Sequence, residues 1–198
     1  MRSALAAALL ATALASAAAA QRPHRSGLWF ELGGGPAAVR VACASCEEVT
    51  TSGGSGGYLR IGGVLSDRVL LGVETFGFTD ETFGFSAGDT SFVAETGTVT
   101  AVALWFPWRS GAFLKGGVGI ADGRFTTTPE AGPPQEVQGT GVGLTFGVGW
   151  DFALSRKAAI TASAAAYITA IGDIVLPAGT VDDVIATMYV LAVGFTVK

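Results

Sequence analysis

Residues 141–152 alternate without interruption between large apolar and small or polar side chains, in the order GVGLTFGVGWDF. The large side chains are Val142, Leu144, Phe146, Val148, Trp150 and Phe152. A period of two places alternate residues on opposite faces of an extended strand, and it does not fit a helix. The segment therefore predicts a β-strand with one wholly apolar face, which needs an apolar environment.

The composition indicates that this environment is lipid. Hydrophobic residues make up 49% of the 198-residue chain and charged residues only 14%, with a mean hydropathy of +0.50. After the N-terminal segment, no run of about 18 apolar residues predicts a spanning helix. Backbone polar groups inside a bilayer must be paired within the protein, which leaves a closed barrel. The net charge of −4 disfavours a nucleic-acid partner.

The first 20 residues have the features of a cleaved signal peptide. Arg2 supplies the positive charge, residues 4–15 form an apolar stretch, and residues 18–20 are three alanines typical of a cleavage site. We therefore expect residues 1–20 to be a signal peptide and residues 21–198 to form one outer-membrane β-barrel domain.

Eight alternating segments follow in the mature chain. They lie near residues 27–35, 55–65, 69–78, 96–107, 112–121, 140–152, 158–171 and 184–197. Three intervals are tight turns, whereas the other four connections are long, polar and rich in Gly, Pro, Thr and acid. Short and long connections alternate strictly, as in bacterial barrels with short periplasmic turns and longer external loops. The sequence thus predicts an all-β, eight-stranded antiparallel up-and-down transmembrane β-barrel.

This pattern resembles the small outer-membrane β-barrel proteins of the OmpA and OmpX type over essentially all of the mature chain. The last segment, TMYVLAVGFTVK, is similar to the assembly signal of such families, although it ends on Lys198 where family members commonly end on an aromatic residue. The resemblance implies export to the outer membrane of a Gram-negative-type envelope, contact with outer-membrane lipid, and insertion by the barrel-assembly machinery. We expect a monomer.

The strand face opposite the lipid carries five charged residues: Glu31, Arg60, Glu74, Lys115 and Asp151. Because eight strands enclose a space that side chains just fill, these charges are expected to pair across the lumen. A proton or ion pathway is the alternative interpretation of the same residues. The remaining inward positions are mostly Gly, Ala, Ser and Thr, so a cavity for a small apolar solute also stays open.

Tryptophans mark the predicted periplasmic ends of the strands. Trp29, Trp105, Trp108 and Trp150 all lie there, as in the aromatic belt of a membrane protein. The period of two directs Trp29 and Trp105 into the barrel.

Other chemistry-bearing residues are few. Cys43 and Cys46 are spaced C-x-x-C in the first long connection and predict a disulfide, because neither a thioredoxin-like context nor two further zinc ligands accompany them. His24 is the single histidine and precedes the first segment, away from the loops where an external substrate would be cut. We expect no catalytic residues, no metal and no cofactor.

The long connections are acidic and the short turns are basic, which favours either solubility of the external loops or divalent-cation binding there. The acids are Glu47, Glu48, Asp80, Glu81, Asp89, Glu95, Glu130, Glu136, Asp173, Asp182 and Asp183. We therefore expect a non-enzymatic integral outer-membrane barrel with a structural or surface-interaction role carried by its external loops. A channel for small hydrophobic solutes and a soluble ligand-binding β-barrel are the alternatives.

Overall fold

The computed structural model describes residues 27–42, 50–80, 91–108, 110–128, 135–176 and 179–198. The expected signal peptide, His24, Cys43 and Cys46 lie outside these ranges. Within them, no helix is long and apolar enough to cross a membrane.

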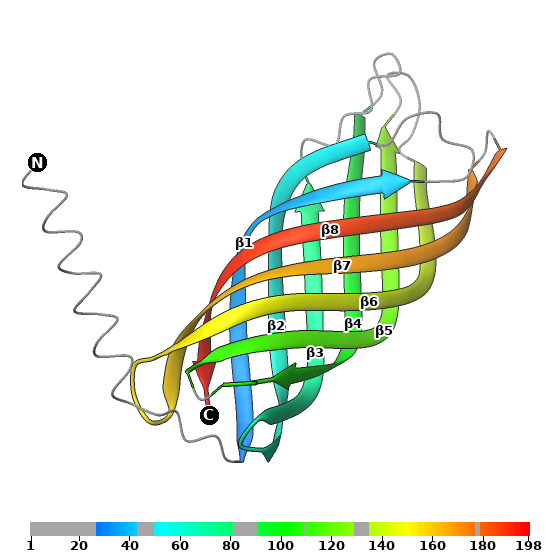
Figure 1. Cartoon of the computed structure of the whole chain (residues 1–198). Helices are drawn as coiled ribbons and strands as arrows, with labels where there is room; N and C mark the ends of the chain where they lie inside the picture. Colours follow the sequence, from blue (N-terminus) through cyan, green and yellow to red (C-terminus); the bar gives the residue numbers. More distant parts are fainter. Residues whose placement is uncertain (1–26, 43–49, 81–90, 109, 129–134, 177–178) are drawn as a thin grey trace, which may run out of the picture.

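Eight strands form a closed barrel in sequence order, with β8 returning to pair with β1 (Figure 1). The strands are β1 (Leu28–Ala42), β2 (Thr50–Ser66), β3 (Val69–Asp80), β4 (Ser91–Trp105), β5 (Ala112–Thr128), β6 (Gln135–Ala153), β7 (Ala158–Leu176) and β8 (Gly179–Val197). Every neighbouring pair is antiparallel. The predicted all-β, eight-stranded up-and-down barrel is confirmed.

The two faces of each strand differ as the alternation predicts. In β8, Leu191 is 65% exposed whereas Ala192 is 4% exposed, and the same alternation continues along the strand. Large apolar side chains therefore cover the outside of the barrel, where a soluble protein would carry polar ones. This arrangement explains the high hydropathy of the chain, because an outer wall in lipid needs no polar cover.

The interior holds two hydrophobic clusters. The first is centred on Tyr58, Phe76, Tyr167 and Met188, and the second, nearer the short turns, on Trp29, Leu70, Phe106 and Phe113. Along β3 the buried residues run from Leu70 through Glu74 to Phe76, so a charged layer separates the clusters. The lumen is thus filled with side chains above and below this layer.

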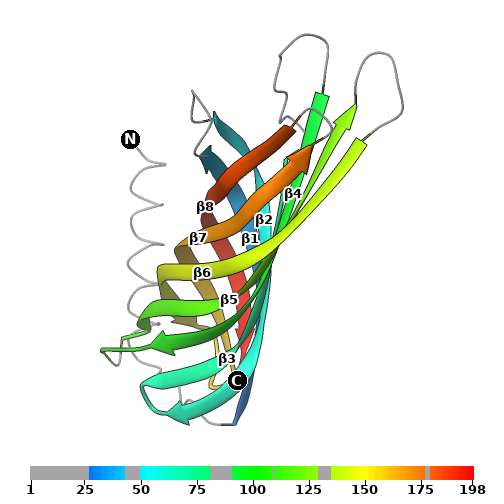
Figure 2. The same ribbon diagram turned by 90° about the vertical axis from the view of Figure 1, so that its right-hand side faces the viewer.

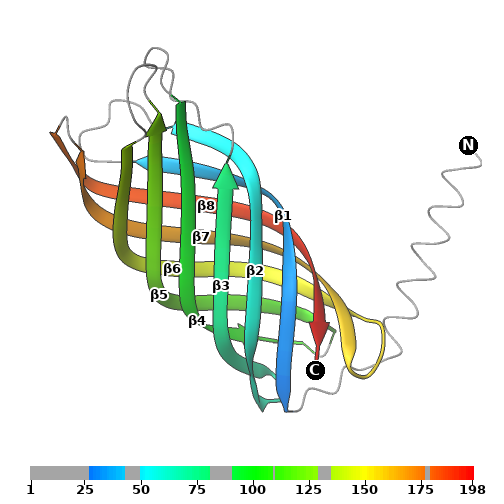
Figure 3. The same cartoon turned by 180° about the vertical axis from the view of Figure 1, so that it is seen from behind.

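The two ends of the barrel differ in form. Figure 1 and the reverse view in Figure 3 place the C-terminus and the short turns at one end of the barrel, and the ends of β1, β3, β5 and β7 at the other, far end. At that far end the strands continue beyond the predicted bounds. In the side view of Figure 2 the far ends of β4 (from Ser91), β5 (to Thr128) and β6 (from Gln135) rise highest, and these paired ends are called the arms. The strands stay paired beyond the segments in which apolar and polar residues alternate, because backbone hydrogen bonds can hold a hairpin together even where both of its faces are polar.

One predicted long connection is wrong. The interval between residues 171 and 184 was expected to be a loop, yet β7 runs to Leu176 and β8 begins at Gly179. The β7–β8 pairing shifts register on either side of Gly172, which has a φ of +77°. Such a bulge interrupts the period of two, so the alternation alone does not reveal the continued strands.

Candidate functional site

The charged layer is organised around Arg60 on β2. Strand register places Glu31 of β1 opposite Arg60 on one side and Glu74 of β3 opposite it on the other. Residues directly opposite each other on the inner face lie close enough for their side chains to meet. The barrel therefore aligns one cation between two anions on three adjacent strands.

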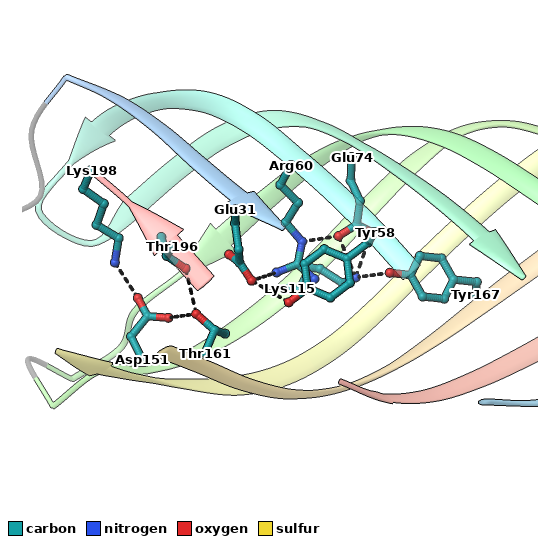
Figure 4. Close-up of polar contacts among 10 residues, drawn as sticks. All are labelled: Glu31, Tyr58, Arg60, Glu74, Lys115, Asp151, Thr161, Tyr167, Thr196 and Lys198. Carbon is teal, nitrogen blue, oxygen red and sulfur yellow. Dashed lines mark hydrogen bonds and ion pairs between the residues drawn. The ribbon is translucent and has the colours of Figure 1, made fainter. Parts of the chain in front are cut away.

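Hydrogen bonds join these side chains directly (Figure 4). Arg60 donates from Nη1 to Glu31 Oε1 over 2.8 Å and from Nε to Glu74 Oε2. Tyr58, two residues away on the same face of β2, donates from its hydroxyl to the same Glu31 oxygen over 2.7 Å. The Arg60 guanidinium carbon also lies 4.0 Å from the centre of the Tyr58 ring. Arg60 is thus held by ion pairs and by a cation–π contact.

Lys115 extends the layer across the lumen from β5. Its Nζ donates to Glu74 Oε1 over 2.8 Å and to the Tyr167 hydroxyl of β7 over 2.9 Å. The Tyr167 ring stacks on Phe76 with centroids 3.8 Å apart and planes 10° from parallel. The network therefore reaches from β1 to β7, and an aromatic pair lies beside it.

Asp151 belongs to a separate cluster near the short turns. Asp151 Oδ2 pairs with Lys198 Nζ at 2.5 Å, and Asp151 Oδ1 accepts a hydrogen bond from Thr161 over 2.9 Å. The hydroxyls of Thr161 and Thr196 lie 2.7 Å apart. The structure therefore brings four of the five predicted lumen charges together and places the fifth with the C-terminal residue (Figure 4).

The larger cluster balances its charge. It combines Glu31 and Glu74 with Arg60 and Lys115, and each of these residues is at most 5% exposed. Isolated buried charges are costly, whereas paired and hydrogen-bonded ones are tolerated. The arrangement suits a cross-linked plug that holds the strands around a filled lumen. Among the described residues, no group of three or more His, Cys, Asp or Glu side chains is placed to hold a metal ion.

The sequence does not single out several members of these clusters, namely Tyr58, Lys198 and the threonines Thr161 and Thr196. Tyr58 shares a face with Arg60, so the period of two was sufficient to identify it. Lys198 follows the end of β8, where strand parity does not predict which way a side chain points. In the sequence this residue is notable only because it stands where related proteins commonly have a terminal aromatic residue.

Of the tryptophans, Trp29 is buried as predicted, but Trp105 is 49% exposed on the outer wall. Its strand is apolar on both faces at this end, which leaves the parity ambiguous.

Comparison with known proteins agrees with this architecture. Neisserial surface protein A superposes with a TM-score of 0.56 at 18% sequence identity, covering 88% of this chain and 99% of that one. Ail, the attachment invasion locus protein of Yersinia pestis, gives 0.57 at 17% identity, covering 86% and 99%. A major outer membrane protein from Thermus thermophilus gives 0.52 at 13% identity, covering 88% and 99%. At these identities the likeness concerns the fold alone.

The sequence itself identifies the family. Among curated proteins, none matches this chain. The family model described as the outer membrane protein beta-barrel domain matches residues 4–196. The chain therefore belongs to the outer-membrane β-barrel family.

Proposed function

We propose that the protein is a non-catalytic, non-conducting outer-membrane barrel whose role is surface interaction, carried by the arms at its far end. The observation that supports this most strongly is the filled lumen. Four charged side chains and two tyrosines meet across the barrel, with hydrophobic clusters on both sides. A barrel whose interior is occupied in this way has its ends and its outer wall available for function.

The arms have the chemistry of surfaces exposed to water. On β4 and β5 the outward apolar residues give way to Glu95, Asp122 and Arg124, which are all exposed. Glu95 and Arg124 lie opposite each other in the register. In barrels of this kind the longer connections face the cell exterior. Two of the structural neighbours are a surface protein and an attachment protein by name, which makes adhesion the first activity to test.

The test is adhesion by cells that carry the full protein or a trimmed form. Replacing residues 80–94 and 126–136 each with Asn-Gly closes both hairpins at residues that remain paired, Thr79 with Glu95 and Phe125 with Val137. Asn-Gly is the preferred two-residue hairpin turn. The trimmed barrel should still insert and fold, because pairing and lipid contact lie below the cut, while adhesion to host cells or matrix falls to background.

A control carries arms of the same length with scrambled sequence, and it should also lose adhesion. Trimming that leaves adhesion intact would refute the surface role. Uptake of a small aromatic hydrocarbon by the same cells tests the alternative of a hydrophobic-solute channel. Uptake that rises with expression of the full protein would favour the channel instead.

A further inference from the structure

The outer wall carries a furrow over β6, β7, β8 and β1, which lie side by side in Figure 1. Two adjoining hollows of about 810 and 630 Å³ share Pro36, Val148, Ala164 and Leu191 in their lining. All four residues lie on the outward parity of their strands. The two hollows therefore form one continuous furrow on the face that meets lipid.

The furrow follows from side-chain size. Its floor is β7, where the outward positions that line it are alanines at 162, 164 and 166. Large side chains stand on both sides: register places Ala164 between Val148 of β6, 54% exposed, and Leu191 of β8, 65% exposed. Alanines flanked by larger apolar residues leave a lengthwise depression of the kind that a hydrocarbon chain fills.

An arginine lies at the far end of this depression. On β1, Pro36 and Ala38 line the furrow, and Arg40 is the next outward residue, exposed on the same face. Arg40 lies opposite Thr187 of β8 and Thr51 of β2, so neither adjacent strand offers it an acid. Within the described part of the chain Arg40 makes no ion pair. Tyr189, opposite Ala38 and 53% exposed, adds a hydroxyl nearby.

We propose that the furrow holds an acyl chain of an anionic membrane lipid, with the lipid phosphate, which no cation in the headgroup neutralises, bound by Arg40. The guanidinium is a planar donor that suits phosphate, and the apolar furrow leads away from it along the wall. The long-connection end of such barrels lies at the outer leaflet. The cation at the end of the furrow matches the phosphate of an anionic lipid, and the apolar furrow matches its acyl chain.

A second copy of the barrel fits the same wall less well. A two-fold interface presents the same patch on both subunits. Each subunit would then bring an Arg40 to the same depth without supplying an anion for either. The lipid satisfies both the apolar furrow and the cation, so we assign the furrow to lipid.

Native mass spectrometry of the full protein tests this assignment. The protein is released from mixed micelles that contain phosphatidylglycerol or phosphatidylcholine with identical acyl chains, so that only the headgroup charge differs. The wild type should retain one phosphatidylglycerol in preference to phosphatidylcholine. Arg40→Gln should reduce phosphatidylglycerol retention about fivefold, the effect of one cation at an anionic lipid surface. It should change phosphatidylcholine retention much less, because the choline cation already neutralises that phosphate.

Matched variants separate the furrow from the general wall. Ala164→Phe fills the furrow and should reduce retention of both lipids. Ala101→Phe enlarges an outward alanine on β4, between Val73 and Val118, and should change neither. Arg156→Gln removes an exposed arginine from the opposite end and should also have no effect. Heat-dependent gel migration verifies that each variant is folded.

Three results would overturn the proposal. The first is phosphatidylglycerol retention that Arg40→Gln and Ala164→Phe leave unchanged. The second is an equal loss in Ala101→Phe, which would mean that the whole wall binds lipid uniformly. The third is a lipid-free dimer that Ala164→Phe dissociates, which would assign the furrow to a second copy. None of these results depends on adhesion, so lipid binding in the furrow is tested independently of the proposed surface role.

Discussion

At the scale of single residues, Arg60 is the centre of the buried charged layer. This side chain contacts Glu31, Glu74 and Tyr58, and it is fully buried. Removing one partner of a buried ion pair is strongly destabilising, because the remaining charge stays buried without compensation. The energetic coupling between neighbours therefore reveals the network better than any single substitution.

A double-mutant cycle on Arg60→Met and Glu74→Leu measures this coupling by urea unfolding in lipid vesicles. Each single change should cost about 3–5 kcal/mol, and the double change should cost about 1–3 kcal/mol less than the sum. As a control, Arg60→Met combined with Asp151→Asn joins two separate clusters and should be additive within about 0.5 kcal/mol. Zero coupling between Arg60 and Glu74 would show that the ion pair does not stabilise the barrel.

At the scale of the strand, side-chain parity decides whether a position meets lipid or lumen. Leu144 of β6 faces outward and is 38% exposed, whereas the adjacent Gly143 is buried. A Cβ added at Gly143 would meet its nearest atom, Ile120 O, at 3.4 Å, an ordinary contact. Gly147 is a poorer comparison, because its added Cβ would lie 2.9 Å from Ala164 O. Neighbouring positions on one strand therefore offer a matched test.

Leu144→Arg should reduce the free energy of unfolding by about 2–4 kcal/mol, the cost of a cation near the bilayer midplane. Gly143→Ser should have a much smaller effect, since it adds one small polar side chain on the inner face. A folding titration into vesicles measures both. Equal losses from the two substitutions would contradict the register of β6.

Strand parity also explains how far the sequence could predict the structure. The alternation at 141–152 and 187–197 identified the lipid face, and it placed Glu31, Arg60, Glu74, Lys115 and Asp151 on the opposite face, where the structure has them buried. The sequence also predicts that Arg60 pairs with Glu74, since a tight turn joins their strands, and the structure has this ion pair. Partners on other strands could not be predicted, because parity gives a face and not a register between strands. Three further features could not be predicted from the alternation. The arms lie in polar surroundings above the lipid, the bulge at Gly172 interrupts the period of two, and Lys198 lies beyond the last strand.

At the scale of the whole molecule, the barrel is a closed wall around a filled interior. Eight strands leave little space inside, and here hydrophobic clusters and a neutral ion-pair network occupy it. The apolar outer wall meets lipid and the polar arms extend from one end. The surface role proposed above rests on this occupied interior, so it matters whether the lumen is sealed to ions and solutes.

Ion and solute flux through the purified protein in liposomes measures directly whether the lumen is sealed. Potassium conductance and arabinose entry are compared between vesicles with the folded protein, vesicles without protein and vesicles that contain a known porin. Vesicles with the folded protein should be indistinguishable from empty ones, because Arg60, Lys115 and Tyr167 meet across the lumen and occupy it. Flux well above that of empty vesicles, in protein verified as folded by its gel migration, would contradict this prediction.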